Sequence, residues 1–199
     1  MNSLLKNGFT LAEIMVTISI VSIIMTSVLF SYTTFSDKLA LSSAAQEIAI
    51  VVRQAQTYGL TVRESSVAGG QFSYAYGVYF DFVSDQTHYY LFVDTNSNNK
   101  YDVGNGCGSS STECVEQGTL RNNVLITSVC DATTCPPVVN VRKMNITFLR
   151  PNPDATIIFT DNGGTTLSGP STTGKVTLTS RKGSTSTVTI ESTGQVNVQ

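Results

Sequence analysis

The sequence predicts an α+β fold in which one long N-terminal helix packs on antiparallel β-sheets. An apolar run extends from Phe9 to about Tyr32, and an amphipathic stripe continues to about Gly59. Beyond Gly70 the apolar residues alternate with polar ones. Apolar steps of three and four are typical of a helix, and strict alternation is typical of a half-buried strand. The expected segments are a leader (1–8), a transmembrane and assembly helix (9–33), an amphipathic helix half (34–60) and a β domain (61–199).

The first segment of the helix has the composition of a membrane anchor. Between Lys6 and Asp37 the only charged side chain is Glu13. A run of this length can cross a bilayer core, which needs about 20 residues. Lys6 favours a cytoplasmic N-terminus, because positive charges are retained on that side.

Glu13 makes this anchor unusual, because an isolated charge in hydrocarbon costs at least about 2.5 kcal/mol. The carboxylate therefore needs a partner at the same membrane depth. If the chain is cut after Gly8, the new amino group of Phe9 lies near that depth. The Phe9 amine of a neighbouring copy, shifted along the helix axis, would pair with Glu13 in good geometry. The anchor is therefore also predicted to direct assembly.

The second segment of the helix is expected to pack on protein. Gly59 is the predicted helix stop, and no proline precedes Pro136 to break the helix earlier. Small residues in the anchor either favour close helix–helix approach or are simply tolerated there. The apolar stripe consists of Leu41, Ala45, Ile48, Val52 and Ala55, and the small anchor residues are Thr17, Ser19, Ser22, Thr26 and Ser27.

Short strands separated by turn clusters are predicted for the rest of the chain. In the first strand, Phe72, Tyr74, Tyr76, Val78, Phe80 and Phe82 are expected on one face, with Ser73, Ala75, Gly77 and Asp81 on the other. Asp161–Gly164 is a typical turn cluster. The further predicted strands are His88–Val93, Val124–Val129, Met144–Leu149, Ala155–Thr160, Lys175–Thr179 and Thr185–Glu191.

The segment Gly8-Phe9-Thr10-Leu11-Ala12-Glu13 resembles the class III signal of type IV pilins and of the pseudopilins of type II secretion. The resemblance implies that a prepilin peptidase cuts after Gly8 and N-methylates Phe9, and that Glu13 guides subunit docking. It also implies a single-pass protein of the inner membrane with its C-terminal domain outside the cytoplasm. Ala12 departs from the larger aliphatic residue common there. The alternative is an ordinary secretory signal or plain anchor, but a secretory signal has its apolar region before the cut.

Three later stretches are similar to the GspH/FimT family of minor pseudopilins: Glu47–Gln56, Ile157–Gly164 and Val188–Val196. The implied fold is pilin-like, a long helix with a C-terminal antiparallel β-sandwich. The implied function is a structural minor pseudopilin of a type II secretion pseudopilus, with other pseudopilins and the inner-membrane assembly platform as partners. A minor pilin of a type IV pilus, acting in fibre priming, adhesion or DNA uptake, is the alternative. A membrane-anchored calcium-binding or ligand-binding β domain that never polymerises is a third hypothesis.

Polar residues at alternate positions follow the His88–Val93 strand and match the start of a calcium loop. Two features weaken the match: Asn99 replaces the usual glycine, and Asn105 stands where a bidentate carboxylate is usual. The alternative is an Asn-rich hairpin turn. No cofactor is required by the sequence, and calcium would bind weakly, at about 10⁻⁴–10⁻³ M. The candidate ligands are Asp94, Asn96, Asn98, the Lys100 carbonyl and Asp102.

The four cysteines, Cys107, Cys114, Cys130 and Cys135, lie in polar loops of a chain expected to leave the cytoplasm. Four cysteines allow three disulfide connectivities, of which two local pairs are the simplest. Each such loop would contribute roughly 2–3 kcal/mol. A Cys₄ zinc site is the alternative, although its ligands usually come in tighter pairs.

Other signals argue against enzymatic and nucleic-acid functions. Gly169–Val176 is one residue short of a phosphate-binding loop and is predicted to be a turn. His88, the sole histidine, has no nucleophile at a catalytic spacing and is predicted to be structural, so no enzyme is expected. The net charge is −2, and no cation follows Lys182. Since phosphate contacts supply most nucleic-acid affinity, Arg181 and Lys182 are interpreted as a solvated turn.

Overall fold

The computed structural model describes residues 8–61, 73–102, 104, 107, 112–132, 135 and 140–199. Leader residues 1–7, the predicted first-strand residue Phe72, Asn105 and Pro136 therefore lie outside the described residues. The chain divides into two compact units, Met1–Asp37 and Lys38–Gln199. One helix, α1 (Leu11–Leu60), contributes to both units, and each unit is considered by itself below.

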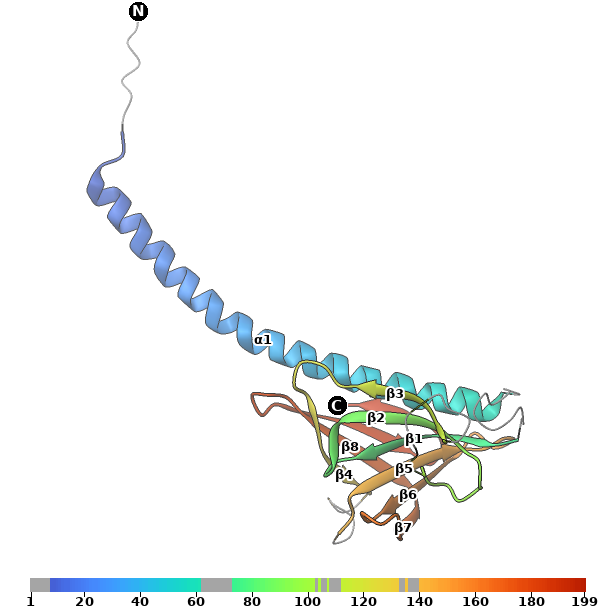
Figure 1. Cartoon of the computed structure of the whole chain (residues 1–199). Helices are drawn as coiled ribbons and strands as arrows, with labels where there is room; N and C mark the ends of the chain where they lie inside the picture. Colours follow the sequence, from blue (N-terminus) through green and yellow to red (C-terminus); the bar gives the residue numbers. More distant parts are fainter. Residues whose placement is uncertain are drawn as a thin grey trace, which may run out of the picture. The chain divides into compact units, whose positions relative to one another are not determined.

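In the first unit, which Figure 1 draws in blue, α1 has many exposed apolar side chains, at successive positions such as Ile14, Met15 and Val16. Phe9, just before the helix, is 79% exposed, and Ile20 within it is 53% exposed. A helix that is apolar all round belongs either in a protein core or in a membrane. The described part of this unit supplies no core of its own.

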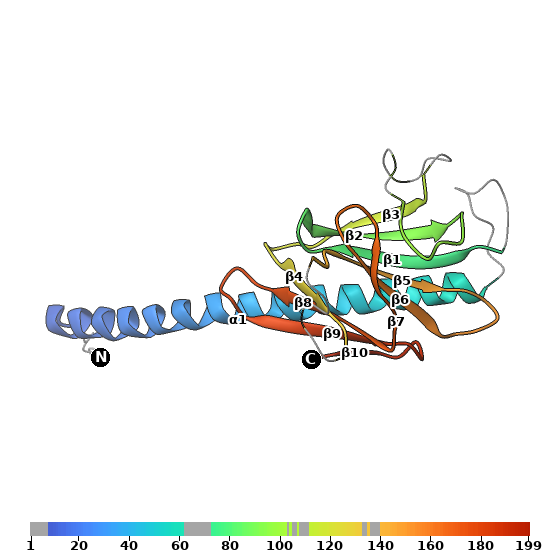
Figure 2. The same ribbon diagram turned by 90° about the horizontal axis from the view of Figure 1, so that it is seen from below.

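The second unit combines residues 38–60 of α1 with two antiparallel sheets (Figures 1 and 2). Sheet A has the strand order β3-β2-β1-β5-β6-β7, and sheet B has the order β10-β9-β8-β4. This confirms the predicted layout of a long helix on antiparallel sheets. The strands are β1 (Ala75–Asp81), β2 (Asp85–Asp94), β3 (Cys114–Thr119), β4 (Leu125–Cys130), β5 (Lys143–Phe148), β6 (Ala155–Thr160), β7 (Thr166–Ser171), β8 (Thr173–Thr179), β9 (Thr185–Glu191) and β10 (Val196–Val198).

All seven predicted strands exist, and β6 and β9 have the predicted bounds. Three strands were missed, β3, β7 and β10, and all three lie at sheet edges. Their sequences, CVEQGT, TLSGPS and VNV, are too polar or too short to show an alternating apolar pattern. The predicted turn at Gly169–Val176 is wrong, because its first three residues end β7 and its last four lie in β8. Pro170 is accommodated because an edge strand tolerates the missing N–H.

One main core joins the helix to both sheets. The predicted stripe is buried, and Ile48 is 0% exposed. Val78 and Phe80 of β1 and Val188 and Ile190 of β9 belong to the same cluster. The helix thus covers residues from both sheets, and this core joins all three.

Gly59 does not stop the helix, which ends at Leu60. A Cβ placed on Gly59 would meet the backbone carbonyl of Phe148 in β5. The glycine is therefore explained by close packing of the last helical turn on sheet A. The predicted role was wrong, because the sequence does not reveal how closely a strand approaches.

Sheet A also buries residues on its other face. Tyr79, Phe92, Tyr101 and Cys114 form a second apolar cluster, and every residue of β1 is buried. Asp81, predicted on the face away from the core, is also buried. Its carboxylate accepts hydrogen bonds from the Val83 and Ser84 amides at 3.0 and 2.8 Å, so it stabilises the turn into β2.

Candidate assembly segment, Asp94 loop and disulfides

Thr10 caps the start of α1. Its hydroxyl oxygen accepts a hydrogen bond from the Glu13 amide at 3.2 Å, and its carbonyl accepts one from the Ile14 amide. A threonine in this position typically stabilises a helix by about 1 kcal/mol, because the first amides otherwise lack partners. Thr10, a residue of the Gly8–Glu13 segment, therefore also determines where the helix begins.

Glu13 lies in the first turn of α1, where the helix dipole favours a negative charge. Gly8 and Phe9 precede the helix and are exposed. The structure therefore brings Gly8, Phe9 and Glu13 to one end of α1, with the cleavage position outside the helix. Nothing lies within 4 Å of a Cβ built on Gly8, so no described residue covers this position.

The hydroxyl groups of the anchor are satisfied within the helix. Four Ser and Thr side chains donate to backbone carbonyls three or four residues earlier, at 2.8–2.9 Å. Such bonds lower the cost of placing hydroxyls in hydrocarbon, where water is absent. The four residues are Thr17, Ser19, Ser22 and Thr26.

Among the described residues, α1 is the one helix long and apolar enough to cross a membrane, and its most apolar window is fully exposed. These properties fit a single-pass membrane anchor. They agree with the expectation for residues 9–33, which rested on composition alone.

The predicted calcium ligands lie together in the loop that follows β2. Asp94 is 1% exposed, and its two carboxylate oxygens accept hydrogen bonds from the Asn98 and Asn99 amides at 3.1 and 2.7 Å. Asp102 Oδ2 accepts from the side-chain amides of Asn96 and Asn98 at 2.6 and 3.1 Å. Asn99 has a φ of 58°, the left-handed conformation that asparagine tolerates.

These contacts are those of a hydrogen-bonded hairpin turn, and calcium binding by this loop stays a prediction. Asn96 Oδ1 accepts from the Asn98 amide, and Asn98 Oδ1 accepts from the Lys100 amide. The Lys100 ammonium donates to the Gly164 carbonyl at 3.1 Å. The side-chain oxygens are thus engaged by the loop itself.

Glu113, which sequence reasoning missed, fastens this loop to the sheet. Its Oε1 accepts from the Thr95 amide and hydroxyl at 2.9 and 2.8 Å, and its Oε2 accepts from the Asp102 amide at 2.9 Å. Burial raises the pKa of Glu113 despite these hydrogen bonds. No local pattern in the sequence could have identified Glu113, because it precedes β3, a strand that the sequence did not predict.

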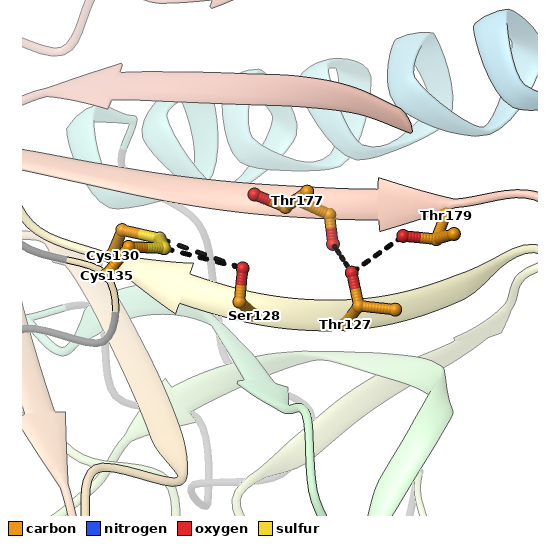
Figure 3. Close-up of a disulfide and its surroundings, with 6 residues drawn as sticks. All are labelled: Thr127, Ser128, Cys130, Cys135, Thr177 and Thr179. Carbon is orange, nitrogen blue, oxygen red and sulfur yellow. Dashed lines mark hydrogen bonds between the residues drawn. A yellow bond between two sulfur atoms is a disulfide. The ribbon is translucent and has the colours of Figure 1, made fainter. Parts of the chain in front are cut away.

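The disulfides confirm the simplest pairing, Cys107 with Cys114 and Cys130 with Cys135. The Cys₄ zinc alternative is therefore excluded. Figure 3 shows the second disulfide at the end of β4, with the Ser128 hydroxyl near both sulfurs. Cys114 belongs to the second apolar cluster and Cys107 packs against it, so the first disulfide lies on that cluster.

The remaining predicted residues occupy hairpins. His88 Nδ1 lies 2.6 Å from Asp85 Oδ1 near the β1–β2 turn. Burial opposes the charge of Asp85, but hydrogen bonds from Tyr90 and His88 outweigh it and lower the pKa of that carboxyl. Arg181 and Lys182 are exposed in the β8–β9 turn, as interpreted from the sequence.

Comparison with known proteins finds one match, in the N-terminal segment. Residues 5–29 match the prokaryotic N-terminal methylation motif. No curated protein and no solved structure matches the chain. The motif is that of type IV pilin and pseudopilin precursors, so the chain carries the N-terminal signature of a type IV pilin-like protein. The motif implies processing by a prepilin peptidase and assembly with other pilins.

Proposed function

We propose that the chain is a minor pseudopilin of the GspH/FimT type, which assembles through its N-terminal helix into the pseudopilus of a type II secretion system. The observation that carries the proposal is Glu13, placed in the first turn of an apolar helix directly after the methylation site. A structural rather than catalytic role agrees with this placement.

The first unit supplies the assembly chemistry. Cleavage after Gly8 creates an amine on Phe9, two residues before the first residue of α1. In hydrocarbon a carboxylate and an ammonium attract strongly, because the low dielectric constant screens them little. A neighbouring subunit shifted along the axis brings its Phe9 amine to Glu13, so correct stagger and charge neutralisation occur together. The exposed aliphatic side chains then pack between subunits.

Processing is tested by the mature N-terminus. Mass spectrometry of the protein from membranes is expected to show N-methylated Phe9 as the first residue. Replacement of Gly8 by valine is expected to leave an unmethylated, full-length precursor, whereas Ala12→Leu, a matched change of size beyond the cut, is processed normally. A functional protein that begins at Met1 or beyond residue 25 contradicts the proposal.

A deletion distinguishes the secretion pseudopilus from the alternative of a type IV pilus. Loss of exoprotein secretion with normal pili and transformation is expected, and complementation with the intact gene restores secretion. Loss of pili or of transformation, with secretion unchanged, supports the minor pilin instead. If neither process changes, the chain is not an essential member of either fibre.

A further inference from the structure

A cavity of about 290 Å³ lies on the face of sheet A that carries the second apolar cluster. All of its described lining residues belong to the second unit, and none of them lies in α1. Its described lining comes from four neighbouring strands, the loop after β2 and the turn after β6. The residues that the argument uses are Tyr79, Asp81, Tyr90, Tyr101, Gln117 and Lys143.

The floor of the cavity follows directly from strand register. Tyr79 of β1 pairs with Tyr90 of β2, which pairs with Gln117 of β3. On the other side, Tyr79 pairs with Asn145 of β5. Asn145 Oδ1 accepts a hydrogen bond from the Tyr101 amide at 2.9 Å, which fixes the loop that carries the third tyrosine. The site is therefore built by the sheet itself.

The three tyrosine rings contact one another. Tyr90 stacks on Tyr101 with centroids 5.4 Å apart and an interplanar angle of 19°. Tyr79 lies 5.0 Å from Tyr101 and 5.8 Å from Tyr90 by ring centroids. Such contacts restrict the rings, so an aromatic wall is present before any ligand binds.

Carboxylates hold the tyrosine hydroxyls in place. Tyr90 donates to Asp85 Oδ2 at 2.6 Å and Tyr79 donates to Asp81 Oδ2 at 3.3 Å. Gln117 Nε2 approaches the Tyr90 hydroxyl at 3.4 Å. Burial, together with the nearby carboxylates, raises the pKa of Tyr79 and Tyr90. Both hydroxyls therefore remain protonated, and the cavity combines aromatic carbon with fixed polar groups.

Lys143 closes the cavity on the β5 side and limits the charge of a ligand. Its ammonium lies 6.0 Å from the centroid of the Tyr79 ring and donates to the Asn162 carbonyl at 3.0 Å. The position over an aromatic ring is the one that a bound cation would take. Asp81 already accepts hydrogen bonds from Tyr79 and from the turn amides. Asp85 accepts one from Tyr90 and lies 2.6 Å from His88 Nδ1. A cationic ligand would therefore be repelled by the Lys143 ammonium, and the carboxylates of Asp81 and Asp85, already hydrogen-bonded, would offset this repulsion little.

We infer that this cavity binds a neutral sugar unit of a glycan. A sugar ring presents an apolar face of C–H groups, which suits the tyrosine wall, and a rim of hydroxyls, which suits the Gln117 amide, the tyrosine hydroxyls and the Lys143 ammonium. The volume lies near the lower limit for small-molecule sites, so it accommodates one or two sugar rings. This inference does not rest on the proposed assembly function.

The test uses the full-length protein in micelles of a zwitterionic detergent, because a detergent with a sugar head group would compete. Saturation-transfer NMR with the methyl glycosides of glucose, galactose, mannose and the two N-acetylhexosamines is expected to show millimolar binding of at least one. Tyr90→Ala is expected to weaken that binding about tenfold, and Gln117→Ala about threefold. Thr187→Ala, in sheet B, is the matched control and leaves binding unchanged.

Amide spectra of each variant establish that it is folded, and Gln117 is exposed, so its substitution leaves the core intact. Lysine amide and tetramethylammonium are measured in parallel as cationic probes. Binding of these cations in place of sugars overturns the inference. It is overturned equally if no glycoside binds, or if binding persists unchanged in folded Tyr90→Ala and Gln117→Ala.

Discussion

The two segments of α1 have the same secondary structure but different sources of stability. Ile20, in the first unit, is 53% exposed, whereas Ile48, in the second, is 0% exposed. Both side chains are large and aliphatic, so propensity does not separate them. Hydrophobic burial stabilises Ile48 inside its own chain. Ile20 gains the same stabilisation only from lipid or from neighbouring subunits.

Polar groups differ between the two segments in the same way. In the first unit the hydroxyls bond to their own helix. In the second, helical side chains reach the sheets: Glu47 accepts from Tyr89, Arg53 donates to the Val196 carbonyl, and Gln56 donates to the Pro153 carbonyl. The hydroxyls named in the first segment thus have hydrogen-bond partners within their own helix, whereas its apolar side chains are not buried by the rest of the chain. The following substitutions test this difference.

The largest effect is expected from Glu13→Gln, which removes the charge and keeps the shape. Insertion and cleavage remain intact, because the anchor becomes more apolar. Incorporation into the fibre is expected to be lost, since the pairing with a neighbouring Phe9 amine is gone. Quantitative blotting of sheared fibres measures it, with Thr17→Ala as the control. Unchanged incorporation would mean that the charge is not an assembly contact.

Ile48→Ala and Ile20→Ala compare the two segments directly. Removal of the buried side chain is expected to lower the free energy of unfolding of the second unit by about 2–5 kcal/mol. The same change at Ile20 is expected to leave that free energy unaltered, because Ile20 lies outside the core. Thermal unfolding of the full chain in micelles measures both. Equal losses would show that the two segments share one core.

The Asp94 loop gives the next effect. Asp94→Ala leaves the buried amides of Asn98 and Asn99 without their carboxylate and is expected to cost about 1–3 kcal/mol. Because the loop oxygens are already engaged, we expect this loss and the wild-type melting temperature to be the same in calcium, magnesium and chelator. A calcium-dependent stabilisation of about 1.4 kcal/mol, removed by Asp102→Ala at an exposed position, would instead establish an ion site.

Thr10→Ala is expected to have the smallest effect, a local loss of about 1 kcal/mol at the start of α1. The Glu13 amide loses its acceptor, so its hydrogen exchange in micelles is expected to quicken. The melting temperature of the second unit stays unchanged. Thr17→Ala, which removes only a hydroxyl donor, is the control. A global loss of stability in Thr10→Ala would contradict a purely local cap.

Local patterns in the sequence predicted the features that depend on neighbouring residues. Helical periodicity identified the buried stripe with Ile48, and alternation identified β6 and β9. The segment from Gly8 to Glu13 predicted, by its resemblance to prepilin signals, the N-terminal methylation motif that residues 5–29 match. Disulfide pairing followed because local pairs were the simplest choice.

Features that depend on strand register were not predictable in this way. Gly59 was interpreted as a helix stop. Its close approach to Phe148 was not predictable, because the two residues lie far apart in the chain. Glu113 was missed for the same reason, since its three donors belong to Thr95 and Asp102. The tyrosine cavity requires β3, β2, β1 and β5 to be adjacent, and no periodicity within one strand encodes that order.

The union of residues 41–55 with β9 in one core bears on how the protein is made. About 130 residues of chain must be synthesised between the helix and the strand that helps to cover it. Contacts this distant in sequence slow folding, because a large loop must close before they form. The buried stripe is therefore exposed on the growing chain after the anchor has emerged.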